Sequence, residues 1–199
     1  MKELLKSYNE KRDSIKNRLA EFKNLSEEQK FQEFLFCLLT PQSNAQRCWS
    51  AVEEISKLKE FTEKEIHNIL KTRTRFHNTK TQRILKARIQ WPNIKQNLSN
   101  TNIKELRNFL AENVNGYGLK EAGHFLRNIG LSNNKIAILD RHILRNLKSL
   151  NIINEDKIKN RKHYLELENS FLEFSNRINI PVDELDLLWW SKENGEIFK

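Results

Sequence analysis

Apolar residues recur at the three- and four-residue spacing of α-helices along nearly the whole chain, and strand-like alternation is almost absent. Two segments open with a capping-box pattern, Ser26 with Gln29 and Thr62 with Glu65. The segment FQEFLFCLL is apolar on almost every side, so we expect it to run through the core. The periodicity predicts helices at about 2–23, 27–39, 43–57, 63–70, 78–90, 103–113, 119–129, 141–150, 161–178 and 182–192. We therefore expect a compact all-α protein with one domain over residues 1–199, built as two helical lobes.

The bulk composition indicates a globular protein without a disulfide framework or a zinc site. A chain of 199 residues with 38% apolar residues is long enough to bury a core. Its two cysteines, Cys37 and Cys48, have neither disulfide nor zinc spacing, and no segment has the pattern of a signal peptide or a membrane span. These features predict a cytoplasmic protein, close to the nucleoid in a prokaryote. We expect no metal and no organic cofactor.

The net charge of +9 comes from one segment, which we call the basic window. Residues 66–104 hold nine Lys or Arg and no Asp or Glu, and the rest of the chain has as many acidic as basic residues. Such a surface is typical of a protein that binds a polyanion such as DNA, and we expect Arg73, Lys80 and Arg83 to contact phosphates. The alternative is a solvated helical face. Binding to a membrane surface is disfavoured because no broad apolar face accompanies the charge.

Four of the five glycines fall between residues 116 and 130, where two periodic segments meet. This spacing predicts a helix, a glycine hairpin and a second helix over about 103–130. The first N–H groups of the second helix form an anion site, so we expect Gly116, Tyr117 and Gly118 to hold a DNA phosphate. The alternative is an ordinary helix connection with a glycine cap.

Two charged residues follow the hairpin. Lys120 lies on the first turn of the second helix, where the helix dipole repels its positive charge and favours a neutral, nucleophilic amine. Asp140 stands directly before the segment RHILRNL. It is a good helix cap there, and a capping aspartate is also rigid enough to serve in catalysis.

The stretch VNGYGLKEAGHFLRN followed by ILDRHILR resembles the helix-hairpin-helix-GPD superfamily of base-excision DNA glycosylases. The resemblance implies that Lys120 is the nucleophile of a glycosylase/lyase and that Asp140 is the catalytic carboxylate. The loop LLTPQSNAQ resembles the family segment whose Gln or Asn fills the gap left by a flipped base. That role falls to Gln42, with Asn44 nearby. The alternative for this loop is a polar helix cap.

Two further segments, TRFHNTKTQRI and ELDLLWWSKENGEIFK, resemble the type 2 8-oxoguanine DNA glycosylase/lyase group. The resemblance implies that Phe76 and Trp190 sandwich the extruded base and that Asp186 and Lys199 contact it. We also expect His142 to contact DNA. The alternatives are ordinary core aromatic residues and a frayed terminus.

Two features depart from the superfamily. The hairpin reads VNGYG rather than LPGVG, and no proline lies between the hairpin and Asp140. Two cysteines are too few for the iron–sulfur cluster of other branches. We therefore expect a helix-hairpin-helix-GPD fold without that cluster.

The resemblance implies a bifunctional DNA glycosylase/AP lyase, acting as a monomer on double-stranded DNA that contains oxidised guanine. One alternative is a monofunctional glycosylase for another damaged base, which would not need Lys120. The other is a helix-hairpin-helix module that only binds DNA, which would not need Asp140 or the aromatic pair.

Overall fold

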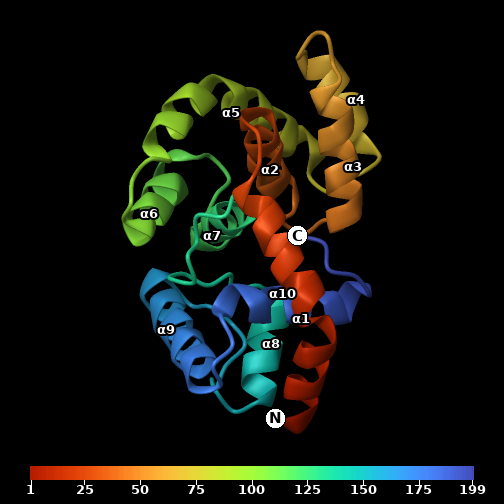
Figure 1. Ribbon diagram of the computed structural model, residues 1–199. Helices are drawn as coiled ribbons and strands as arrows, with labels where there is room; N and C mark the ends of the chain where they lie inside the picture. Colours follow the sequence, from red (N-terminus) through yellow and green to blue (C-terminus); the bar gives the residue numbers. More distant parts are fainter. The chain divides into compact units, whose positions relative to one another are not determined.

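The computed structural model describes residues 1–192 and 195–199, and within them it contains ten α-helices and no strand (Figure 1). The all-α prediction is confirmed. The helices are α1 (Lys2–Lys23), α2 (Glu27–Leu39), α3 (Ala45–Ser56), α4 (Glu63–Lys71), α5 (His77–Asn97), α6 (Ile103–Asn113), α7 (Leu119–Asn128), α8 (Arg141–Ser149), α9 (Arg161–Arg177) and α10 (Val182–Asn194).

Most predicted helix boundaries agree with the structure to within two residues, and α5 is the exception. It was expected to end near residue 90, before Pro92, but it continues to Asn97. Proline inside a helix removes one backbone hydrogen bond and crowds the preceding turn. Packing on both sides of the proline outweighs this cost, because the Trp91 ring lies 5.3 Å from that of Phe34 and Ile94 is buried.

The predicted capping boxes differ in how completely they form. Ser26 and Gln29 exchange both hydrogen bonds of the box at the start of α2. At the start of α4, the Thr62 hydroxyl accepts from the Glu65 N–H, and it donates to the Glu65 carboxylate at 2.7 Å. The two sequence patterns therefore both mark a helix start, as side-chain capping requires.

The chain divides into two compact units, with one boundary between α1 and α2 and the other inside α7. The middle unit comprises residues 25–125, with α2 in its core. Seven successive residues of α2, from Glu33 to Leu39, are buried, as the apolar sequence predicted. The ring of Phe34 packs against Tyr117 and Phe125, with centroids 5.3 and 5.4 Å away.

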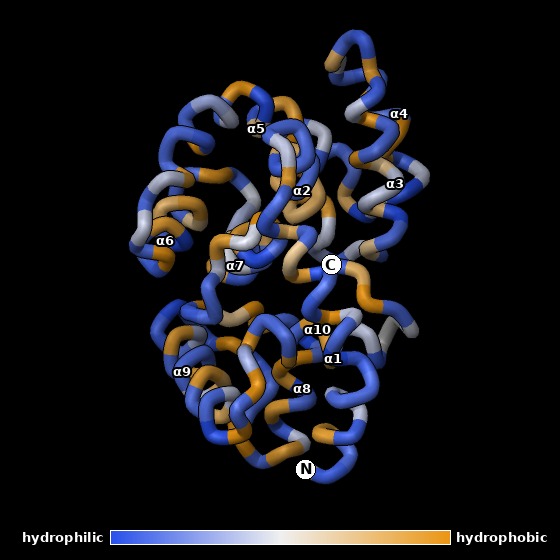
Figure 2. The backbone as a smooth tube through the Cα atoms, viewed as in Figure 1, coloured by the Kyte–Doolittle hydropathy of each residue, from blue (hydrophilic) through white to orange (hydrophobic). Residues whose placement is uncertain are grey.

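The terminal unit comprises residues 1–24 and 126–199. Its first helix, α1, lies beside its last, α10, although they come from opposite ends of the sequence (Figure 1). The Tyr8 hydroxyl donates to the Glu184 carboxylate at 2.6 Å, and Trp189 stacks on Phe171 at 5.2 Å. Figure 2 shows apolar and polar stretches alternating along the helices of each unit, as their amphipathic patterns require.

The described residues lack two kinds of feature. None of their helices is long and apolar enough to cross a membrane. In the same part of the chain, no three His, Cys, Asp or Glu side chains gather into a group that could hold a metal ion.

Gly130 gives a test of the terminal unit's packing. Its φ is +72°, and a Cβ there would lie 2.8 Å from the Lys23 Cα. Gly195 has φ +80° with no atom within 4 Å of such a Cβ, so it is the matched control. The backbone strain of alanine in this region costs about 1–2 kcal/mol at either site. We expect Gly130→Ala to lower the free energy of unfolding clearly more than Gly195→Ala in urea titrations. Equal losses would contradict the close approach of Lys23.

Candidate active site

The predicted hairpin lies between α6 and α7 in the middle unit. The Tyr117 N–H donates to the Val114 carbonyl at 3.0 Å, and Gly116 has φ +103°. A Cβ at Gly116 would lie 2.6 Å from Cδ of Arg83. Glycine is therefore required here both for the backbone conformation and for the approach of Arg83.

The side chain of Tyr117 is buried, which leaves the predicted phosphate contact to the backbone of the hairpin. Its hydroxyl donates to the Phe34 carbonyl at 2.8 Å, and its ring packs in the core of the middle unit. Burial raises the pKa of Tyr117 well above its usual value, so the hydroxyl stays protonated as a donor. Tyr117 therefore anchors the hairpin to α2.

Lys120 is the second residue of α7, as predicted, and its side chain is partly exposed. The Lys120 ammonium lies 3.0 Å from the carboxylate of Glu121. The other carboxylate oxygen of Glu121 accepts from the Gly118 N–H at 3.1 Å. Glu121 thus joins the helix start to Lys120, a role that our sequence analysis missed. Its position three residues after Gly118, which precedes the helix, was the available signal.

Asp140 is the N-cap of α8 in the terminal unit. One carboxylate oxygen accepts from the His142 and Ile143 N–H groups, each at 2.8 Å. The other oxygen accepts from the Trp190 indole N–H at 2.8 Å. Three donors therefore fix the carboxylate and orient the Trp190 ring beside it. The His142 ring lies 6.2 Å from that of Trp190 in an edge-on arrangement, so this structure brings together three predicted site residues.

The remaining predicted residues of the terminal unit are buried. Asp186 forms an ion pair with the Arg127 guanidinium at 3.0 Å, and both side chains are almost completely buried. Lys199 is 8% exposed, and its ammonium lies 5.9 Å from the centroid of the Phe198 ring. The last residue is thus not a frayed, exposed terminus. Asp186 lies one helical turn before Trp190 on α10.

Two residues expected at the flipped base have an unusual backbone conformation. Among the described residues, six that are not glycine have positive φ, and four of these are asparagine, which tolerates it. The other two are Gln42 and Phe76, at +55° and +57°. Both are exposed, and Phe76 is 54% exposed. Strain of this kind collects at functional sites, so the geometry supports a role for both side chains.

The loop of Gln42 and the segment of Phe76 are joined by Ser43. Its hydroxyl accepts from the Arg75 N–H at 3.0 Å. Asn44 caps α3 by accepting from the Arg47 N–H at 3.0 Å, so the alternative role of this loop as a helix cap is also realised. The middle unit therefore brings the Gln42 loop and the residue before Phe76 together.

The basic window is less uniform than its sequence indicates. Lys80 is 1% exposed, and its ammonium donates three hydrogen bonds within the middle unit. The expectation that it contacts DNA phosphate is wrong, because its donors already have buried partners. Arg73 is partly buried and pairs with Glu54. Arg75 and Lys86 are exposed.

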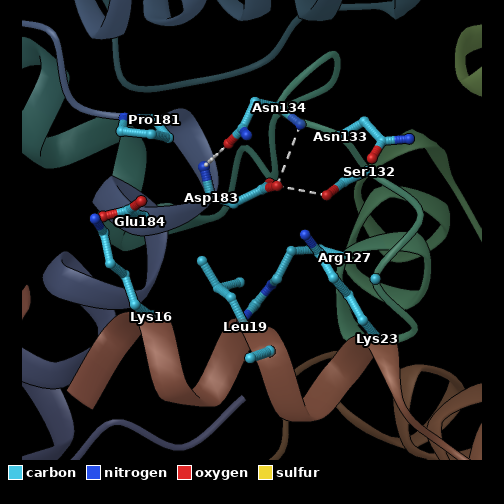
Figure 3. A pocket seen from close by; sticks show the side chains of 12 residues that line it. Lys16, Leu19, Lys23, Arg127, Ser132, Asn133, Asn134, Pro181, Asp183 and Glu184 are labelled. Atoms are coloured by element: carbon cyan, nitrogen blue, oxygen red, sulfur yellow. Dashed lines mark hydrogen bonds between the residues drawn. The ribbon is translucent and has the colours of Figure 1, made fainter. Parts of the chain in front are cut away.

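A separate cavity of about 300 Å³ opens in the terminal unit (Figure 3). Lys16, Leu19 and Lys23 of α1 line one side, and the loop after Gly130 lines another. Asp183 in its wall accepts from the Ser132 hydroxyl at 2.5 Å, as the dashed lines in Figure 3 show. None of the predicted catalytic or base-binding residues lines this cavity, so we do not assign it to the site.

Comparison with known proteins gives consistent matches. The family model described as 8-oxoguanine DNA glycosylase matches residues 15–180. A curated protein of Fusobacterium nucleatum, named 8-oxoguanine DNA glycosylase/AP lyase, is 39% identical over 99% of this chain and 96% of its own length. A protein of the same name from Methanocaldococcus jannaschii is 37% identical over 94% of this chain and 93% of its own.

Solved structures agree with these sequence matches. The Methanocaldococcus jannaschii 8-oxoguanine glycosylase/lyase, in complex with 15mer DNA containing 8-oxoguanine, matches with a TM-score of 0.88 at 36% identity, over 100% of both chains. The 8-oxoguanine DNA glycosylase of Thermotoga maritima matches with a TM-score of 0.90 at 30% identity, over 100% of this chain and 97% of that one. The two-lobed glycosylase fold implied by the sequence is thereby confirmed.

The corrected view of the basic window can be tested through the salt dependence of DNA binding. Each lost phosphate contact lowers the slope of log affinity against log salt by about 0.9. We expect Arg75→Gln with Lys86→Gln to flatten the slope, because both side chains are exposed. Lys57→Gln, an exposed lysine outside the window, is the control. A double variant with the native slope would place the DNA contacts elsewhere.

Proposed function

This chain belongs to the 8-oxoguanine DNA glycosylase family, and from that premise we propose that it is a bifunctional DNA glycosylase/AP lyase that excises 8-oxoguanine from double-stranded DNA. The observation that carries the proposal is Lys120 at the head of α7, directly after the glycine hairpin. It is supported by relatives of that name along nearly the full length of the chain. The two units together form the single glycosylase/lyase domain, with its helix-hairpin-helix at about 103–130.

DNA binding begins at the phosphates. The hairpin backbone at Gly116 and Gly118 holds one phosphate at the start of α7, where the phosphate takes the place of the Glu121 carboxylate on the Gly118 N–H. Exposed basic residues of the window hold other phosphates. Extruding a base from the duplex costs a few kcal/mol, which these contacts offset. Gln42, exposed on its loop, then fills the gap left in the stack, with Asn44 beside it.

The Lys120 amine then attacks C1′ of the deoxyribose, and the bond between C1′ and the base breaks. The base departs with its electron pair and is protonated, while the lysine and the opened sugar form a Schiff base. Loss of a C2′ proton drives β-elimination, which breaks the bond from C3′ to its phosphate oxygen. The strand is thus cut 3′ to the lesion, with no step that requires a metal or an organic cofactor.

Asp140 assists this chemistry as an oriented carboxylate. It either accepts a proton from Lys120 before attack or, as a carboxylate, stabilises the positive charge that develops on the sugar in the transition state. The three N–H donors to Asp140 hold its oxygens in place, so little reorganisation is needed during the reaction. Trp190 shares this network, which supports its role as a platform for the extruded base, opposite Phe76.

Lys199 provides base selectivity. 8-Oxoguanine has an N–H donor at position 7, where guanine has an acceptor. A backbone oxygen of Lys199 is an acceptor that pairs with this N–H, whereas guanine would bring two acceptors face to face at a cost of several kcal/mol at most. The burial of Lys199 supports this role over that of a free terminus. Asp186 provides a second polar contact for the base, and His142 a contact to the DNA.

The alternatives fit less well. A monofunctional glycosylase activates water and has no use for Lys120, and a binding-only module has no use for the Asp140–Trp190 pair. We further propose that the protein acts as a monomer on chromosomal DNA in the cytoplasm of a prokaryote.

Replacing the nucleophile tests the proposal directly. Native protein incubated with 8-oxoguanine duplex and borohydride should form a covalent adduct, and Lys120→Gln should form none. Lys64→Gln is the matched control, because Lys64 is also the second residue of its helix and also precedes a glutamate. An adduct that persists in Lys120→Gln would refute the assignment.

The role of Asp140 can be separated from its structural contacts. Asp140→Asn keeps an oxygen for capping α8, and it should slow single-turnover cleavage at a ready-made abasic site by about a hundredfold. Trp190→Phe removes the indole N–H but leaves the carboxylate, so on this substrate, which has no base to stack, its rate should stay within about threefold of native. A near-native rate for Asp140→Asn would reduce Asp140 to a helix cap.

A further inference from the structure

Lys80 is a buried lysine whose contacts surround one exposed, strained residue. Its ammonium donates to the Leu39 carbonyl at 2.7 Å and to the Pro41 carbonyl at 2.9 Å. It also donates to the Ser43 hydroxyl at 2.8 Å. The last two acceptors lie immediately before and after Gln42. An ammonium has three N–H donors, so this loop occupies all of them.

These contacts explain how Gln42 keeps a positive φ. The left-handed region costs about 1–2 kcal/mol for a residue with a Cβ. Such a residue persists only where its surroundings fix the backbone on both sides. Lys80 fixes Pro41 and Ser43, and the Ser43 N–H adds a hydrogen bond to the Thr40 carbonyl at 3.0 Å. The side chain of Gln42 is left exposed at the tip of a braced loop.

The same network reaches the second strained residue. The Ser43 hydroxyl, which accepts from Lys80, also accepts from the Arg75 N–H at 3.0 Å. Arg75 precedes Phe76, and its guanidinium lies 5.4 Å from the centroid of the Phe76 ring. One buried ammonium is therefore connected to both residues of this unit that are expected to meet the flipped base.

The surroundings of Lys80 disfavour its positive charge. Burial, together with the positive charges of Arg83 and Arg75, lowers the pKa of Lys80 to about 8. The neighbouring Cys48 thiol stays neutral, because burial raises its pKa to about 11. A lysine pKa below the unfolded value means that the buried charge opposes folding below pH 8, and this opposition fades as pH rises towards 10.5. Protonation of this buried lysine thus costs stability.

We propose that Lys80 is a positioning residue that braces the 39–43 loop, so that Gln42 is preset to fill the gap left by the extruded base, and that Ser43 extends this brace to Phe76. The inference rests on the proposed function, since it needs a base that leaves the stack. It replaces the phosphate contact that the sequence indicated for Lys80.

The test measures base extrusion separately from chemistry and from binding. Lys120→Gln serves as the background, so that DNA is bound but not cut. The fluorescence of a 2-aminopurine placed next to the lesion increases when 8-oxoguanine leaves the base stack. Lys80→Met should lower the equilibrium constant for extrusion about tenfold, equivalent to 1.4 kcal/mol, while affinity for undamaged duplex stays within about twofold. Lys64→Met, an exposed lysine outside the window, should leave both unchanged.

A double-mutant cycle with Gln42→Ala shows whether Lys80 acts through Gln42. If it does, the equilibrium constant for extrusion should fall in the double variant, Gln42→Ala with Lys80→Met, by little more than it falls in the weaker of the two single variants. If the residues act independently, the two fold-losses should multiply. Ser43→Ala is the second variant. It replaces Lys80→Met if the latter does not fold to a native structure, as judged by the absence of a cooperative unfolding transition. It removes one acceptor of Lys80 and the acceptor of the Arg75 N–H, and it should also weaken extrusion at unchanged affinity.

The outcomes are distinct. The positioning role would be overturned if Lys80→Met and Ser43→Ala both extrude 8-oxoguanine as well as the background protein does. It would also be overturned if the losses in the extrusion constant multiply in the double-mutant cycle. In either case, adduct formation through Lys120 in the native chain would still support the proposed function. A native chain that neither extrudes nor excises 8-oxoguanine would overturn the proposed function and this inference with it.

Discussion

The middle unit depends on the burial of the second half of α2, from Glu33 to Leu39, whose backbone carbonyls hold two functional segments. The Phe34 carbonyl accepts from the Tyr117 hydroxyl, which fixes the hairpin just before Lys120. The Leu39 carbonyl, at the other end of the helix, accepts from the ammonium of Lys80. A helix that is apolar on nearly all sides has little freedom to rotate or slide in its core. The hairpin and the Gln42 loop therefore inherit their positions from the packing of one helix.

The sequence was sufficient to predict the positions of the helices along the chain. Helical periodicity and capping residues depend on neighbours close in the chain, and these placed most helices to within two residues. The orientation of α10 was not predicted: Trp189 is buried, whereas the adjacent Trp190, which the resemblance implied for the site, donates to Asp140. The extension of α5 through Pro92 could not be predicted, because it depends on contacts between Trp91 and residues about sixty positions away, such as Phe31.

The chemistry of single residues was harder to predict wherever it depended on burial. Lys80 and its neighbours in the basic window look alike in sequence, and only tertiary packing separates a buried donor from an exposed cation. Tyr117 likewise lies in a hairpin typical of phosphate binding, yet its ring fills the core. The strain at Gln42 and Phe76 has no signal in composition or spacing, because neither glycine nor asparagine marks the turn. Such departures from local preference are expected where a site is preorganised.

The most direct test of the account identifies the atom that attacks the sugar. The borohydride-trapped complex of native protein and 8-oxoguanine duplex is digested with trypsin and nuclease, and the modified peptide is sequenced by mass spectrometry. Modification of Lys120 blocks cleavage after it, so the account predicts a single peptide, 108–127, that carries the sugar remnant on Lys120. A remnant on another lysine or on the N-terminal amine, or no adduct at all, would contradict it.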